Sequence, residues 1–120
     1  DGVLRSLGDQ VKAVCEDAVK RCDVRVTETR NALSEVFPES VQKIVEKACS
    51  ARGYTYRYLP SGAGHDARYL NPFCLSGMVF VPCHNGISHN EDEYVGPAAL
   101  AKGAQIVADT LLMLDEQLAF

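Results

Sequence analysis

Gly77-Met78-Val79-Phe80-Val81-Pro82 is the stretch that decides the fold the sequence predicts. It is a short, uninterrupted apolar run with β-branched and aromatic residues, which is typical of a strand covered on both faces of a sheet. A strand of this kind needs a hydrogen-bonded neighbour on each side. We therefore expect the run to lie inside a sheet that is larger than the run and its nearest neighbours in sequence can form.

Helical and strand-like patterns alternate on either side of this run. Helices are expected at 3–21, from Pro38 to the glycine at 53, at 66–70 and from Pro97 onward. Strands are expected at 24–30, 54–59 and 77–82. The order α-β-α-β-α-β-α predicts an α/β fold with covered sheet faces. Because three strands make a small sheet, we expect a partial sheet that further chain or a second polypeptide completes.

Two of the expected helices carry an apolar stripe that predicts their buried face. In the second helix the stripe consists of Val41, Ile44, Val45 and Ala48. In the last helix it consists of Leu100, Val107, Leu111, Leu114 and Leu118. Gly53 is expected to end the second helix as its C-cap glycine. The short third helix is expected to end at Asn71, because a residue before proline avoids helical angles.

Composition narrows the class of protein. A chain of 120 residues, 47% of them hydrophobic, can form one small domain or a piece of a larger one. The net charge of −4 and the scattered Lys and Arg argue against a nucleic-acid partner. No apolar run is long enough to span a membrane, and the N-terminus has no signal-peptide pattern. Since the sequence does not begin with Met, we expect a trimmed or excised chain.

The five cysteines are odd in number and include no Cys-x-x-Cys pair. Free thiols are therefore favoured over a disulfide framework or a zinc ribbon, which indicates a reducing, cytoplasmic location. Cys83 is adjacent to His84, but neighbouring side chains on an extended chain point to opposite sides, which argues against a thiol–imidazole dyad. Arg30 and Asn31 end a predicted strand and could bind an anion, although a solvated position is the favoured interpretation.

His89 is the first candidate for chemistry. It follows the apolar run by a short loop and is succeeded by the acidic residues 91–93. Loops after strands line the binding crevice of α/β sheets, a neutral imidazole binds Zn²⁺, and a carboxylate such as Glu93 can orient it. The alternative is a solvated polar loop in which Glu93 lies near a helix N-terminus, and the pattern alone favours this alternative.

The second candidate is the turn Ser61-Gly62-Ala63-Gly64-His65-Asp66. Its two glycines permit backbone angles closed to other residues and allow amide groups to face a ligand. The turn could therefore bind an oxyanion or a carboxylate. The alternative is a tight strand-to-helix turn in which Asp66 caps the helix. It is not a Walker loop, because no Gly-Lys-Ser/Thr follows.

Together these segments carry a family resemblance. The turn at 61–67, the run at 77–82, the segment Gly86-Ile87-Ser88-His89-Asn90 through Glu93-Tyr94 and the closing helix occur in one register. In this register the chain resembles the C-terminal part of the hydantoinase/carbamoylase group of zinc-dependent amidohydrolases. That group includes N-carbamoyl-L-amino-acid hydrolases, allantoate amidohydrolases and β-ureidopropionases.

The resemblance implies a domain organisation and a metal centre. Members are homodimers with a catalytic α/β domain that holds two metal ions, and an inserted domain for dimerisation and closure. Residues 1–32 would be the last helix and strand of the inserted domain, and residues 33–120 the C-terminal part of the catalytic domain. His89 would be a metal ligand, Glu93 a carboxylate behind it, and Gly62, Ala63, Gly64, His65 and Asp66 part of the substrate pocket. The metal is expected to be zinc, although imidazole and carboxylate also accept manganese or cobalt.

The family's other ligands and its catalytic glutamate lie in an N-terminal stretch that has no counterpart here. A catalytic metal needs several protein ligands and a general base. We therefore expect a C-terminal part of a hydrolase that cleaves linear amide or ureido C–N bonds of small molecules, inactive without an N-terminal segment or a second chain. The alternative is a non-catalytic remnant or interaction module derived from that fold.

Overall fold

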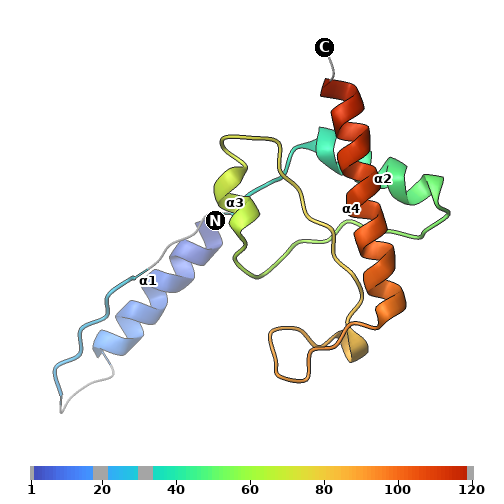
Figure 1. Ribbon diagram of the computed structural model, residues 1–120. Helices are drawn as coiled ribbons and strands as arrows, with labels where there is room; N and C mark the ends of the chain where they lie inside the picture. The colour runs from blue at the N-terminus through green and yellow to red at the C-terminus, as the bar shows by residue number, and fades with distance from the viewer. Residues whose placement is uncertain (1, 18–21, 30–33, 119–120) are drawn as a thin grey trace. The chain divides into compact units, whose positions relative to one another are not determined.

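The computed structural model describes residues 2–17, 22–29 and 34–118 (Figure 1). These residues form α-helices, one 3-10 turn and irregular segments, and they contain no β-strand. The chain divides into two compact units, Asp1–Val36 and Phe37–Phe120, which are described separately below. No helix in the described part is long and apolar enough to cross a bilayer.

The first unit contains α1, Gly2–Asp17. The helix confirms the prediction for residues 3–17, while residues 18–21 lie outside the described part. Its apolar stripe is exposed, and α1 buries none of its residues. The predicted strand at 24–30 is wrong over residues 24–29, which are irregular. Arg30 and Asn31, the candidate anion-binding residues, lie outside the described part.

In the second unit, α2 spans Glu39–Ala51 and ends as the sequence predicts. Gly53 has φ +66°, a left-handed angle that glycine adopts without steric cost. Its amide donates to the carbonyl of Ser50 over 3.0 Å, and the amide of Tyr54 donates to the carbonyl of Cys49 over 2.9 Å. These two bonds form a Schellman motif, which satisfies carbonyl groups at the end of the helix.

The core of this unit lies where α2 packs against α4, Pro97–Leu118 (Figure 1). The buried apolar residues are Val41, Ile44, Ala48, Cys49 and Ile106. Around them pack the half-buried Val45, Tyr54, Val79 and Met113. The stripe predicted for α2 is thus confirmed, because all four of its residues are buried or half-buried.

The stripe predicted for α4 is wrong at three of its five positions. Leu100, Val107 and Leu111 are 59%, 44% and 61% exposed, Leu114 is half-buried, and the side chain of Leu118 lies outside the described part. The residues of α4 that turn inward are instead Ile106, Thr110 and Met113. Apolar residues lie on more than one side of this helix, so periodicity alone did not select the side that faces α2.

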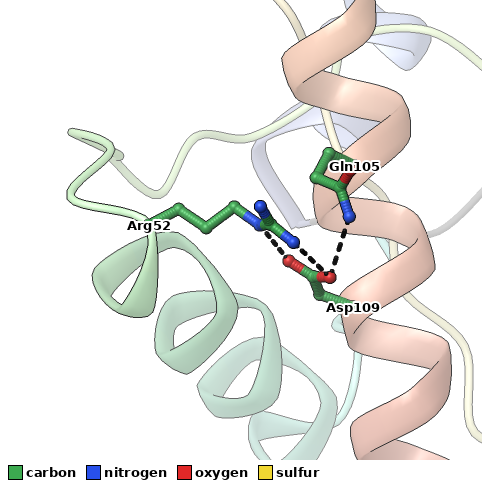
Figure 2. A network of polar contacts seen from close by, with 3 residues as sticks. All are labelled: Arg52, Gln105 and Asp109. Carbon is green, nitrogen blue, oxygen red and sulfur yellow. Dashed lines mark hydrogen bonds and ion pairs between the residues drawn. The ribbon is translucent and has the colours of Figure 1, made fainter.

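A polar contact links the end of α2 to α4 (Figure 2). The guanidinium of Arg52 makes a two-pronged ion pair with the carboxylate of Asp109, and its Nη2 lies 2.9 Å from Oδ1. Gln105, one turn earlier on α4, donates to the same oxygen over 3.0 Å. The pKa of Asp109 is lowered, chiefly because Arg52 donates a hydrogen bond to it.

The predicted α/β fold with a partial sheet is wrong for the described residues, in which 54–59 and 77–82 form no strands. A strand exists only where a neighbour supplies main-chain hydrogen bonds, and neither segment finds one here. Side chains attach the segment 54–59 to α2, because Tyr56 and Tyr58 both donate a hydrogen bond to the carboxylate of Glu46. In the segment 77–82, Phe80 is 48% exposed rather than buried on both faces of a sheet.

The short helix α3 spans Asp66–Leu70, as predicted. The reason given for its end is wrong, because Asn71 keeps helical angles of φ −52° and ψ −36° although a proline follows. The chain leaves the helix through a further turn, in which the amides of Phe73 and Cys74 both donate to the carbonyl of Leu70. All five cysteines are free, as the sequence predicts.

Candidate functional site

His89 lies in a loop whose two ends are joined by the main chain. The amide of His84 donates to the carbonyl of Tyr94 over 2.7 Å. The loop begins with the 3-10 turn η1, His84–Gly86, in which Asn85 has φ 54°. His89 is exposed and has φ 55°, in the left-handed region that residues other than glycine rarely occupy. The loop thus presents an imidazole to solvent from an unusual backbone conformation.

Glu93 is the acceptor around which this loop closes. Its Oε2 accepts a hydrogen bond from the backbone amide of His89 over 3.0 Å. Its Oε1 accepts one from the hydroxyl of Ser88 over 3.2 Å and a longer one from the thiol of Cys83 over 3.7 Å. The carboxylate therefore acts on His89 through the main chain.

These donors shift the protonation equilibria of Glu93 and Cys83. The pKa of the Glu93 carboxyl is lowered, first because the His89 amide donates to it and then because Ser88 and Cys83 do. The pKa of the Cys83 thiol is raised by its desolvation, and further by the charge and hydrogen bond of Glu93. Because the thiolate is the reactive form, this position argues against Cys83 as a nucleophile.

Ser61 and His65 form the polar centre of the turn at residues 61–66. The Oγ of Ser61 lies 2.9 Å from Nε2 of His65 and accepts a hydrogen bond from the amide of Ala63 over 3.2 Å. The ring of His65 is half-buried and meets Phe80 edge-to-face, with 6.0 Å between ring centroids. His65 is also the N-cap of α3, whereas Asp66 is the first residue of the helix. The alternative interpretation, in which Asp66 caps the helix, is therefore wrong.

The glycines of this turn do not use the angles that the sequence suggested. Among the described glycines, positive φ occurs at Gly53 and Gly86 and not at Gly62 or Gly64. A Cβ atom added to Gly62 would meet nothing within 4 Å. What Gly62 provides is open space beside the turn, rather than a strained backbone.

The two candidate segments are connected, but they do not form a metal centre. His65 contacts Phe80, and the same segment continues to Cys83, which reaches Glu93. Across the described ranges, no three His, Cys, Asp or Glu side chains lie close enough to hold a metal ion. A catalytic zinc site takes three protein ligands. The residues that the structure describes therefore do not fit a complete catalytic metal centre.

A shallow apolar hollow lies on α1, in the first unit. It is lined by Leu7, Gln10, Val11, Val14 and Cys15. These side chains include no carboxylate and no imidazole. The hollow therefore has no acid–base group with which to act as an active site.

Comparison with known proteins decides the family. Residues 4–113 match the family described as peptidase family M20/M25/M40. The chain belongs to this family. M20 enzymes are generally metal-dependent hydrolases, and the resemblance to zinc-dependent amidohydrolases that the sequence carries is confirmed.

Curated M20-like relatives are similar over nearly the whole chain. An N-carbamoyl-L-amino acid amidohydrolase of Geobacillus stearothermophilus is 39% identical over 114 residues, which cover 88% of this chain and 27% of the relative. The allantoate amidohydrolase of Escherichia coli K12 is 31% identical over 92% of this chain and 26% of the relative. An uncharacterized hydrolase of Haemophilus influenzae is 30% identical over 93% of this chain and 27% of the relative.

The chain thus spans about a quarter of the length of these M20 relatives. No solved structure matches it significantly.

Sequence reasoning missed three features of the site in this M20 chain. The contact of Ser61 with His65 spans four residues, a separation at which two polar side chains in a turn can meet, so a signal existed. The contact of Cys83 with Glu93 closes a loop over ten residues and has no local signature. The left-handed angle of His89 is the third, because such angles are uncommon in any residue other than glycine, although histidine is among the enriched types.

Proposed function

We propose that the whole protein to which this chain belongs is a metal-dependent hydrolase of linear ureido or amide C–N bonds in small molecules. N-carbamoyl amino acids and allantoate-like compounds are the proposed substrates. Support comes from membership in the M20 family and from relatives that are named for these two activities. Because the chain spans about a quarter of those relatives, the remaining part of the site comes from a preceding segment or a second chain.

His89 is the proposed metal ligand of this chain. The observation that supports this assignment is that its imidazole is exposed while its backbone amide is hydrogen-bonded to the carboxylate of Glu93. Zinc is the proposed metal, with manganese or cobalt accepted by the same donors. When bound by a full ligand set, such a metal supplies a water molecule that is acidic enough to attack near neutral pH.

The turn at 61–66 is the proposed wall of the substrate pocket, formed by Gly62, Ala63, Gly64, His65 and Asp66. Open space beside Gly62 and the paired hydroxyl and imidazole of Ser61 and His65 support this role. A small substrate with polar ureido groups needs hydrogen-bonding partners of this kind at one side of the pocket.

We further propose that residues 1–32 belong to a dimerisation and closure domain and residues 33–120 to the catalytic domain. The whole protein would then act as a homodimer in the cytoplasm. Sedimentation of the whole protein tests this proposal, because a species of twice the chain mass is expected. A monomer at micromolar concentration would contradict it.

The proposed activity is tested with the whole protein and three kinds of substrate: an N-carbamoyl amino acid, allantoate and a dipeptide. We expect hydrolysis of at least one ureido compound, loss of that activity with a chelator and its return with added Zn²⁺, Mn²⁺ or Co²⁺. The dipeptide is the control, because the family is also one of peptidases. Preferential cleavage of the dipeptide would contradict the proposed substrate class.

A further inference from the structure

The backbone of His89 adopts a conformation that is uncommon for residues other than glycine. Its φ of 55° lies in the left-handed region, where the Cβ atom of a residue other than glycine crowds the main chain. Such conformations persist where the surroundings impose them, and they gather at binding and catalytic sites. A group that imposes this angle therefore also determines where the imidazole is held.

The carboxylate of Glu93 is placed to impose the angle. Its Oε2 accepts a hydrogen bond from the amide of His89 over 3.0 Å, and its Oε1 accepts one from the hydroxyl of Ser88 over 3.2 Å. Two successive residues are thus fixed by the two oxygens of one side chain. The thiol of Cys83, at the base of the loop, reaches Oε1 over 3.7 Å and ties the carboxylate to the incoming segment.

The rest of the loop closes without this carboxylate. The amide of Glu93 donates to the carbonyl of Asn90, and the amide of Asp92 donates to the side chain of Asn90, each over 3.0 Å. At the base, the amide of His84 donates to the carbonyl of Tyr94. Removal of the Glu93 carboxylate therefore frees the amide of His89 while other bonds keep the loop closed.

We infer that Glu93, together with Ser88 and Cys83, forms a clamp that positions His89 by fixing its main chain. The hydrogen bonds of the three go to one another and to the main chain of His89, not to its imidazole, so they are positioning residues. The consequence for metal binding rests on the proposed function, in which His89 is a ligand. Groups that orient a ligand typically change metal affinity by about 10- to 100-fold when they are lost.

The first experiment tests the clamp without any metal. Labelling of the whole protein with ¹⁵N-histidine gives a backbone amide signal for each histidine, and the His89 signal is assigned by its absence in His89→Ala. We expect the His89 amide to be protected from solvent exchange in the wild type, to lose this protection in Glu93→Ala, which removes the acceptor, and to be less protected in Ser88→Ala, which loosens the acceptor. Ser88→Thr, which keeps the hydroxyl, should retain it, and the His84 amide should be unchanged throughout.

A wild-type His89 amide that exchanges as fast as an unstructured one would overturn the clamp. So would protection that survives in Glu93→Ala, which has no side-chain acceptor. Ser88→Ala keeps the carboxylate, so it tests the clamp independently if Glu93→Ala fails to fold.

The second experiment measures metal affinity of the whole protein by competition with a chelator. We expect Glu93→Ala to weaken binding about 10- to 100-fold and Ser88→Ala to weaken it less, with recovery in Ser88→Thr. In a His89→Ala background, Ser88→Ala should have no further effect, because the clamp acts through His89. An equal loss in that background would overturn the clamp's role.

The two experiments separate the clamp from the proposed function. If His89→Ala leaves metal affinity unchanged, the ligand assignment fails, whereas the amide protection of His89 still decides whether the clamp exists.

Discussion

Gly103 shows how a single missing side chain determines a helix contact. A Cβ atom built on Gly103 would collide with Cγ1 of Val81, so α4 can approach the segment at 77–82 only because this residue is glycine. Gly77 stands in the same relation to α2, where an added Cβ would lie 2.7 Å from Cγ1 of Val41. Because neither glycine has a Cβ atom, the irregular segment can lie close to both helices.

We expect Gly103→Ala to destabilise the chain. Overpacking costs about 1–3 kcal/mol, and the higher helix propensity of alanine returns only about 0.5–1 kcal/mol. Urea unfolding followed by circular dichroism measures the difference. Gly62→Ala is the matched control, because its added Cβ meets nothing and its φ is not positive, and it should change the free energy of unfolding by less than about 0.5 kcal/mol. Equal effects of the two variants would contradict the packing described for Gly103.

At the residue scale, the sequence predicted which residue types stand in the candidate site but not how they are held. Gly53 could be foreseen as a helix terminator, since the chemistry of that position is local. The backbone angle of His89 could not be foreseen, because it depends on a hydrogen bond that the Glu93 carboxylate accepts only when the loop closes.

At the scale of elements, the helices were predictable and the sheet was not. A helix makes its hydrogen bonds within a few residues, so periodicity and end signals in the sequence suffice to find α2 and α4. A strand takes its partners from another segment. The run at 77–82 has the composition of a strand, but within the described residues no neighbour pairs with it.

The inward face of α4 gives a prediction at this scale. Ile106 is 3% exposed and belongs to the core, whereas Leu111 is 61% exposed. We expect Ile106→Ala to lower the free energy of unfolding by about 2–5 kcal/mol and Leu111→Ala to change it by about 0.5 kcal/mol or less. Denaturant unfolding of the two variants compares them directly. A larger loss for Leu111→Ala would mean that the stripe predicted from the sequence is the buried one.

The link from α2 to α4 should make stability depend on pH. The pKa of Asp109 is lowered, chiefly by its hydrogen bond from Arg52, so the folded state favours the ionised carboxylate. The stabilisation is therefore present above the ordinary pKa of an aspartate and is lost as pH falls through the lower value of the folded state. Asp109→Asn should reduce the urea midpoint at pH 7 and differ less from the wild type at pH 3. A difference that does not change between these two pH values would contradict the role of the ion pair.

Glu39→Gln is the control for that experiment. Glu39 pairs with Lys43 over 2.7 Å on the outer side of α2, and both side chains are largely exposed. Solvent screens such a pair, so its removal should have a smaller effect than the loss of Asp109.

At the scale of the whole molecule, the sequence predicted the family and its limits more securely than the fold. Three motifs in one register identified the zinc amidohydrolase group, and the M20 match over residues 4–113 confirms it. Composition could not do this, because hydrophobic content and charge are shared by many unrelated proteins. The metal centre could not be built from this chain, since the described residues bring no three ligand side chains together.

The central claim is that His89 is the part of a metal centre that this chain contributes. The most direct test is the metal content of the whole protein, measured by elemental analysis in the wild type, His89→Ala and His84→Ala. His84 is the matched control, because it is an exposed histidine of the same loop. We predict that His89→Ala loses metal and hydrolytic rate together and that His84→Ala keeps both. Full metal content in His89→Ala would contradict the claim.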